Sequence, residues 1–276
     1  MNRIKIRTLR AVAILCVILL IFTSCHSFEN VQESIPIINA DAFEYNGLTI
    51  SAKRVSRDDT KGISVELSIE NQSTHEYVVS SSAVIINNGM TDLAYECLIE
   101  EKEQLADRLY IPFEVIESAG FVDVSCIEIY FDVQNRTTNN LVYNAGELTI
   151  KSSEPSSPMV SGHILYDQHE IKIYGQYVDE TTIWGSSVLL YVQNTSDKNI
   201  IVSCEQVTVN NCEVSSDYNE LIYANKHSVD NIPLSSTNMD INDIDSSDSI
   251  ILKLKIVDAD TMEIIAETNP IQFYAN

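Results

Sequence analysis

The densest run of chemically capable side chains in this 276-residue chain is MDINDIDSSD at 239–248. Its four carboxylates are Asp240, Asp243, Asp245 and Asp248. Calcium takes six to eight oxygen ligands, and such a loop could supply several of them. The spacing departs from that of an EF-hand loop, because Ile244 stands at the third ligand position and no glutamate closes the loop. The sequence therefore favours a solvated acidic loop, with calcium binding as the alternative.

Catalytic motifs are missing from the sequence. A serine nucleophile needs a base and an orienting group, yet no G-x-S-x-G or S-x-x-K motif occurs in a strand-to-helix setting. No H-E-x-x-H motif is found, and His163, Asp167 and His169 are spaced too loosely to specify a metal. We predict that the chain is not an enzyme and needs no cofactor.

Four cysteines remain once Cys16 of an N-terminal export signal and Cys25 directly after that signal are set aside, namely Cys97, Cys126, Cys204 and Cys212. An even number in an exported chain favours two local disulfides, one in each half of the chain. Buried free cysteines are also good small core residues, so four free thiols are the alternative. A bridge between Cys204 and Cys212 requires Cα atoms within roughly 7 Å.

The N-terminus reads as a signal peptide over residues 1–24. MNRIKIRTLR carries four bases and no acid, and the apolar run at 11–22 is too short for the ~20 residues of a spanning helix. The segment IFTSC resembles a bacterial lipobox, which implies lipidation of Cys25; an uncleaved signal anchor is the alternative. Residues 25–40 then form a lipid-anchored spacer, and the mature chain is held to the extracellular face of the cytoplasmic membrane.

The mature chain is strongly acidic. Removal of the signal leaves 13 bases against 40 acids, a formal charge of −27. Nucleic acid and anionic headgroups repel such a surface, so nucleic acid is not expected as a partner.

The sequence repeats itself at an offset of 123 residues. Residues 48–150 align with 171–273 without a gap, and 19 of these 103 pairs are identical. Fourteen of the identities fall between positions 62 and 99, including Asn71 with Asn194 and Asn87-Asn88 with Asn210-Asn211. Two copies are too few for a solenoid, so each copy should bury its own core.

Short alternating segments make up each copy. Ile127, Ile129, Phe131 and Val133 alternate with polar residues, which is typical of a strand with one buried face. About seven such segments in some 110 residues predict an immunoglobulin-like β-sandwich, with one short helix at 113–120. The sequence therefore predicts an all-β chain of two tandem immunoglobulin-like antiparallel β-sandwich domains after a lipoprotein signal peptide. Their expected bounds are 41–151 and 163–276, joined by a Ser- and Pro-rich linker at 152–162.

The order of strand, N-x-S, strand, V-x-V-N-N and a late alternating strand is similar to the telokin-like, immunoglobulin-like domains of uncharacterised Gram-positive envelope lipoproteins. The resemblance spans 48–150 and 171–273 and implies the fold and the envelope location. It implies no catalytic or binding residue.

Two functions fit these observations. The first is a non-catalytic, lipid-anchored binding or scaffold protein that contacts an envelope protein or a cell-wall polymer. The second is an extracellular sensor or carrier for a small ligand or calcium. A pocket with convergent polar groups would favour the sensor, and an apolar strip on a sheet would favour the scaffold.

Overall fold

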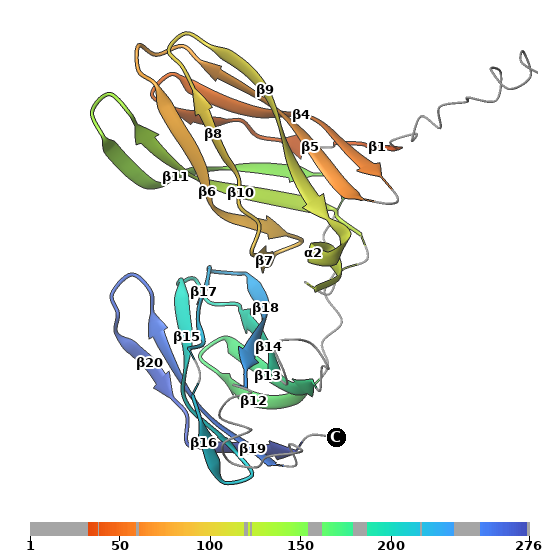
Figure 1. The fold of residues 1–276 in the computed structure, drawn as a ribbon, viewed down its shortest axis with the longest axis vertical. Coiled ribbons are helices and arrows are strands. Elements are labelled where there is room, and N and C mark those ends of the chain that lie inside the picture. Colours follow the sequence, from red (N-terminus) through yellow and green to blue (C-terminus); the bar gives the residue numbers. More distant parts are fainter. Residues whose placement is uncertain are drawn as a thin grey trace, which may run out of the picture. The chain divides into compact units, whose positions relative to one another are not determined.

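Strands dominate the protein, as the alternation of apolar and polar residues predicts (Figure 1). This computed structural model describes residues 33–37, 39–58, 61–118, 121, 123–153, 162–178, 187–215, 217–234 and 249–274. Among these residues the fold is all-β with several antiparallel sheets, which confirms the predicted class. No helix in the described part of the chain is long and apolar enough to cross a membrane.

The N-terminal half, residues 34–153, packs two sheets face to face. The first has the order β1-β4-β5-β9, with β3 on β4. Its strands are β1 (Glu33–Ile35), β3 (Phe43–Tyr45), β4 (Leu48–Asp58), β5 (Gly62–Asn71) and β9 (Gln104–Pro112). The second runs β7-β6-β10-β11-β2, with β8 on β6. Its strands are β2 (Asn39–Ala40), β6 (Tyr77–Ile86), β7 (Gly89–Thr91), β8 (Glu96–Ile99), β10 (Cys126–Asn135) and β11 (Asn140–Lys151).

One core fills the space between these sheets. Ile50, Val65 and Ile69 from the first sheet and Val79 and Ile129 from the second are fully buried in a single cluster. Every second residue of β10 faces this cluster, as the alternation predicts. The short helix α2 (Phe113–Ser118) follows β9 and buries Ile116 in the same core.

The C-terminal half, residues 162–274, has its own core. One wall of this core continues the second sheet, because β18 pairs with β7, and the other wall is a third sheet. One side is β12 (His163–Gln168), β13 (Ile171–Val178), β14 (Ser187–Asn194) and β18 (His227–Pro233), in the order β12-β13-β14-β18. The other has the order β16-β15-β19-β20, with β17 on β15 and β21 on β19. Its strands are β15 (Ile200–Val209), β16 (Cys212–Val214), β17 (Asn219–Ile222), β19 (Ser249–Asp258), β20 (Ile264–Glu267) and β21 (Ile271–Tyr274). Ile173, Leu190, Val202 and Leu254 are among the buried residues of this second core.

Strand bounds in the two halves match at the offset of 123 residues. Adding 123 to the bounds of β6, β7, β8 and β10 gives the bounds of β15, β16, β17 and β19. The pairing partners match as well, because β6 pairs with β7, β8 and β10, while β15 pairs with β16, β17 and β19.

The turn asparagines explain much of this match. Asn87 and Asn88 have φ values of 49° and 68°, and Asn210 and Asn211 have 48° and 69°. Asparagine tolerates this left-handed backbone better than most residues, so it suits the tight turn before β7 and β16. The Asn87 side-chain oxygen accepts the Cys126 amide at 3.0 Å, and the Asn210 oxygen accepts the Ser249 amide at 3.0 Å. The paired asparagines thus close the β6–β7 and β15–β16 hairpins.

Strand β6 runs unbroken from Tyr77 to Ile86. The register against β10 shifts at Ser81 and Ala83, so the polar serines mark a bulge in one strand. The helix at 113–120 is found over Phe113–Ser118.

Candidate interaction surface

Several residues singled out by sequence lie outside the described part of the chain. These are Cys25 and the acidic residues Asp240, Asp243, Asp245 and Asp248. Within the described part, no group of three or more His, Cys, Asp or Glu side chains could hold a metal ion. His163 and His169 are described, and the His169 ring lies 2.6 Å from the Tyr166 hydroxyl.

The four remaining cysteines are free thiols in the structure. Cys97 stands opposite Val79 of β6, whereas Cys126 precedes Ile127, the partner of Ile86. Seven residues of strand separate these two levels, or about 23 Å at ~3.3 Å per residue. A bridge between Cys97 and Cys126 therefore does not form.

The second expected bridge fails for the same reason. Cys212 stands opposite Val209, and Cys204 lies five residues earlier on β15, opposite Leu254. That separation is roughly 16 Å along the strand, against the ~7 Å that a disulfide allows. Burial instead raises the pKa of the Cys204 thiol to about 11, as expected for an inert core cysteine.

A small cavity lies where β7 approaches β17 and β18. Its volume is about 70 Å³. It is lined by Met90, Thr91, Asp92, Val115, Glu220, Ser228, Val229 and Asp230. Organic ligands occupy sites of about 300 Å³ or more, so this cavity is too small for one. Burial, with the charges of Asp230 and Asp92, raises the pKa of Glu220 to about 7.

Residues around this cavity join the two halves. His227 pairs with Gly89 in the parallel direction, which links β18 to β7. The His227 ring packs between Phe121 and Tyr191, with ring centroids 5.5 and 5.4 Å away. A Cβ at Gly89 would lie 2.8 Å from His227 Nε2 and 2.9 Å from the Phe121 ring, so a larger residue would force these rings to shift. The Tyr130 and Tyr223 rings meet edge to face at 5.2 Å.

An apolar row crosses the outer face of the sheet that contains β17, β15, β19 and β20. Leu221 of β17 pairs with Ile201 of β15, Ile201 pairs with Val257 of β19, and Val257 pairs with Ile264 of β20. Directly paired residues point to the same side of a sheet, and none of these four belongs to the inner core. Leu221 and Ile264 are 39 % and 57 % exposed. We call these four residues the C-terminal row.

The equivalent row in the N-terminal half lies on the sheet that contains β8, β6, β10 and β11. Leu98 of β8 pairs with Val78 of β6, Val78 pairs with Gln134 of β10, and Gln134 pairs with Leu141 of β11. Each member lies 123 residues before its counterpart in the C-terminal row. Leu98 and Leu141 are 44 % and 39 % exposed. This N-terminal row thus keeps exposed apolar residues at both ends, as the C-terminal row does.

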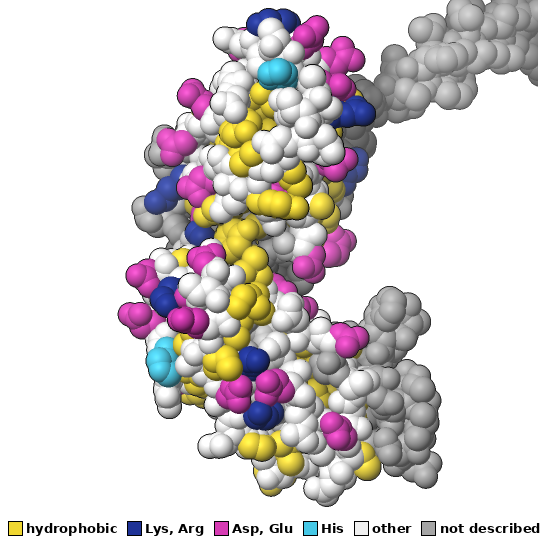
Figure 2. All heavy atoms as spheres, turned by 90° about the vertical axis from the view of Figure 1, so that its left-hand side faces the viewer, with side chains coloured by type: hydrophobic (Ala, Val, Ile, Leu, Met, Phe, Trp, Pro, Cys, Tyr) yellow, Lys and Arg dark blue, Asp and Glu magenta, His cyan; other side chains and the backbone are white. Residues whose placement is uncertain are grey.

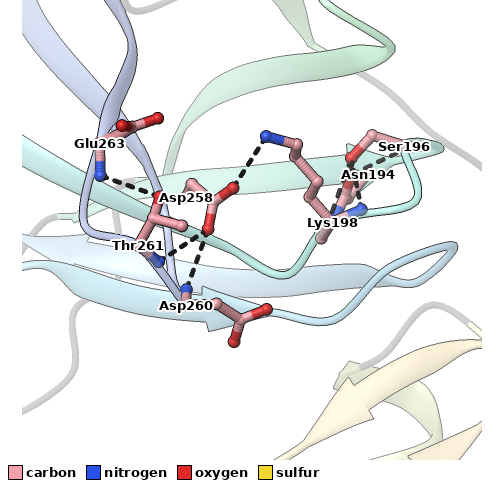
Figure 3. A network of polar contacts seen from close by, with 7 residues as sticks. All are labelled: Asn194, Ser196, Lys198, Asp258, Asp260, Thr261 and Glu263. Carbon is pink, nitrogen blue, oxygen red and sulfur yellow. Dashed lines mark hydrogen bonds and ion pairs between the residues drawn. The ribbon is translucent and has the colours of Figure 1, made fainter.

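A hydrogen-bonded turn holds the end of the C-terminal row. The Asp258 carboxylate accepts the amides of Asp260 and Thr261 at 3.0 Å and the Lys198 ammonium at 2.9 Å (Figure 3). The backbone of Asp258 also pairs with Glu263 and Met262. These bonds hold the exposed Met262, which is 64 % accessible, beside Ile264. The Lys198 contact and the turn amides lower the pKa of Asp258 to about 2, so the turn stays charged and intact near neutral pH.

Charge on the surface is dispersed. On the face drawn in Figure 2, acidic side chains are scattered among basic, polar and apolar ones. Beside the N-terminal row, the next row of the same sheet face holds Glu96, Ser80 and Asp132. Beside the C-terminal row stand Asn219, Ser203, Lys255 and Glu267.

Sequence reasoning did not identify the two rows. Their signal was present in the repeat, because Leu98 and Leu221 are identical and Leu141 aligns with the apolar Ile264. Apolar residues that recur at outer-face positions in both copies are the pattern to look for.

Comparison with known proteins adds no relative. Neither a scan against models of protein families nor a search of curated proteins gave a match for this chain.

Proposed function

We propose that this protein is a non-catalytic binding or scaffold module of the cell envelope, tethered by lipid on Cys25 to the outer side of the cytoplasmic membrane. It consists of two immunoglobulin-like β-sandwich domains, 41–151 and 163–276, that arose by duplication. The matching strand bounds and the repeated turn asparagines support the duplication. The basic start, short apolar run and IFTSC segment support the anchor.

One observation carries the binding function, namely the exposed apolar residues that both halves place at the two ends of an outer-face row. Exposed apolar groups cost solubility, and grouped ones mark interaction sites. In a chain with a formal charge of −23, such residues at equivalent places in both halves point to a binding surface. The partner is a protein or a cell-wall polymer with an apolar contact surface.

The sensor alternative has less support. The cavity between β7, β17 and β18 is too small for an organic ligand, and its carboxylates do not form a metal group. The acidic loop at 239–248, for which calcium binding is the alternative to a solvated loop, lies outside the described residues.

Charge placed in the C-terminal row tests this function. We expect chemical crosslinking in intact cells to give a discrete adduct of the wild-type chain. The Leu221→Asp/Ile264→Asp variant should lose that adduct while keeping its melting temperature. Ile164→Asp is the matched control, because Ile164 is 58 % exposed in the same half but lies on β12. Equal adducts in all three proteins would contradict the proposal.

The anchor is tested separately. Cys25→Ala should release the chain from membranes or leave an unprocessed precursor. A processed variant that remains in the membrane fraction would show that Cys25 carries no anchor.

A further inference from the structure

The outer face of β4, β5 and β9 brings two arginines onto one carboxylate oxygen. Arg54 pairs with Glu66, and Glu66 pairs with Arg108, so the three stand in one row across the sheet. Arg54 Nη2 and Arg108 Nη2 each lie 2.8 Å from Glu66 Oε1. A guanidinium has five N–H donors, so both retain donors beyond this contact. Their side chains are 47 % and 51 % exposed.

A β-bulge adds a third cation to this face. The register between β4 and β5 shifts between Ala52 and Arg54, so Lys53 is the extra residue. Lys53 and Arg54 are neighbours in sequence, and both are exposed. Bulges re-aim side chains and are frequent beside functional sites.

This bulge is specific to the N-terminal half. The equivalent strands β13 and β14 pair without a shift from Ile171 to Val178. At the offset of 123, Lys53 becomes Gln176, Glu66 becomes Leu189 and Arg108 becomes Asn231. The basic cluster and the bulge that shapes it therefore occur together in one copy and are both missing from the described strands of the other.

A groove of about 480 Å³ lies beside Lys53 and Arg108. It is lined by Lys53, Glu66, Leu67, Ser68, Ala106, Asp107 and Arg108. Ser68 and Ala106 are directly paired, and their small side chains leave room between the longer ones. The groove volume lies within the range of about 300–1,000 Å³ typical of ligand sites.

The carboxylates of the groove are already engaged. Asp107 accepts the Tyr95 hydroxyl and the Arg108 amide, each at 2.8 Å. Hydrogen bonding from Arg54, aided by Arg108, lowers the pKa of Glu66 and keeps it ionised. Exposed ion pairs add little to stability. The main effect of the Arg54–Glu66–Arg108 contact is therefore to hold the two guanidinium groups in place.

We propose that this groove binds an oxyanion, a phosphate or carboxylate group, through Arg108 and Lys53 of its lining and through Arg54, which shares the Glu66 oxygen with Arg108. Paired guanidinium groups with fixed geometry match the oxygens of such groups, and Lys53 adds a flexible charge. Glu66 is a positioning residue that orients the arginines while it lowers the local positive charge. The rest of the acidic chain repels anions, so the ligand must reach this one face.

Binding of two multivalent probes to the full chain in detergent tests the proposal by isothermal titration calorimetry. Tripolyphosphate represents a phosphate source, and oligogalacturonate represents a carboxylate source. Arg54→Ala or Arg108→Ala should each weaken binding about tenfold, as loss of one charge-assisted hydrogen bond of about 1.4 kcal/mol would. Glu66→Gln should instead tighten binding, because it removes a competing carboxylate.

Arg136→Ala is the matched control. Arg136 is 50 % exposed and lies 3.2 Å from its partner Glu76, and neither residue lines the groove. Binding of either probe with this variant pattern supports the site and identifies its source. No binding of either probe at about 5 mM, a Kd range that corresponds to roughly 3 kcal/mol, would overturn the proposal. An Arg136→Ala loss equal to that of Arg108→Ala would also overturn it, because binding would then reflect diffuse charge.

Discussion

Lys226 and Glu128 form a buried ion pair between residues 98 positions apart in the sequence. The Lys226 ammonium lies 2.7 Å from one Glu128 carboxylate oxygen and 2.6 Å from the other. Both side chains are only 11 % exposed. Water is largely excluded from this contact, so neither charge can be left without the other at low cost.

Lys226→Met should therefore destabilise the protein. Loss of one partner of a buried pair typically costs about 3–5 kcal/mol, and we expect a loss in this range in urea unfolding. Lys172→Met is the control, because Lys172 pairs with Asp167 at 3.0 Å on the surface and should lose under ~1 kcal/mol. The double variant Lys226→Met/Glu128→Leu should regain most of the loss. Equal losses in the two single variants would show that burial does not matter here.

Ionisation of Glu220, beside the cavity between β7, β17 and β18, should make the stability of the protein depend on pH. Its folded pKa of about 7 stands above its ordinary value of 4.5, because of burial and the charges of Asp230 and Asp92. A raised pKa gives stability that is present below pH 4.5 and lost as the pH rises through 7. The melting temperature of Glu220→Gln relative to wild type should increase across this window and then level off. A flat difference for Glu220→Gln would contradict the buried site.

Protonation of His227 should change the stability of the protein in the opposite direction, with a loss at low pH. Burial, with the nearby Lys226 charge, lowers its pKa from 6.5 to about 4. The unfolded chain then binds a proton at a higher pH than the folded chain does, so stability is lost as the pH falls from 6.5 towards 4. His227→Phe, which keeps a ring between Phe121 and Tyr191, should remove this loss. Parallel melting curves of the variant and wild type between pH 6.5 and 4 would refute it.

The cysteines should titrate as four free thiols in the mature chain besides any lipidated Cys25. Cys97, Cys126 and Cys204 are buried and should react with a thiol reagent only on unfolding, whereas Cys212 is partly exposed and should react first. Mass spectrometry after alkylation without reductant checks this. Any bridged pair would mean that the strand register described for β6, β10 or β15 is wrong.

Most strands could be predicted from the sequence because their patterns depend on neighbouring residues alone. The alternation in β10 follows from one buried face, and the paired asparagines at 87–88 and 210–211 follow from positive φ. The disulfides were expected from number and location alone, which carry no information about register. Glu128 stands at an outer-face position, where the pattern predicts solvent. Its partner Lys226 comes from the other half, and no local sequence pattern shows that a distant residue buries Glu128.

The outer-face rows are proposed to contact a partner in the envelope. The most direct measurement places a photoreactive amino acid at Leu221, and in a second protein at Ile164, in intact cells. We predict a discrete light-dependent adduct from Leu221 that Ile264→Asp abolishes, and none from Ile164. Identical adduct patterns from both positions, or no adduct from Leu221, would contradict the account.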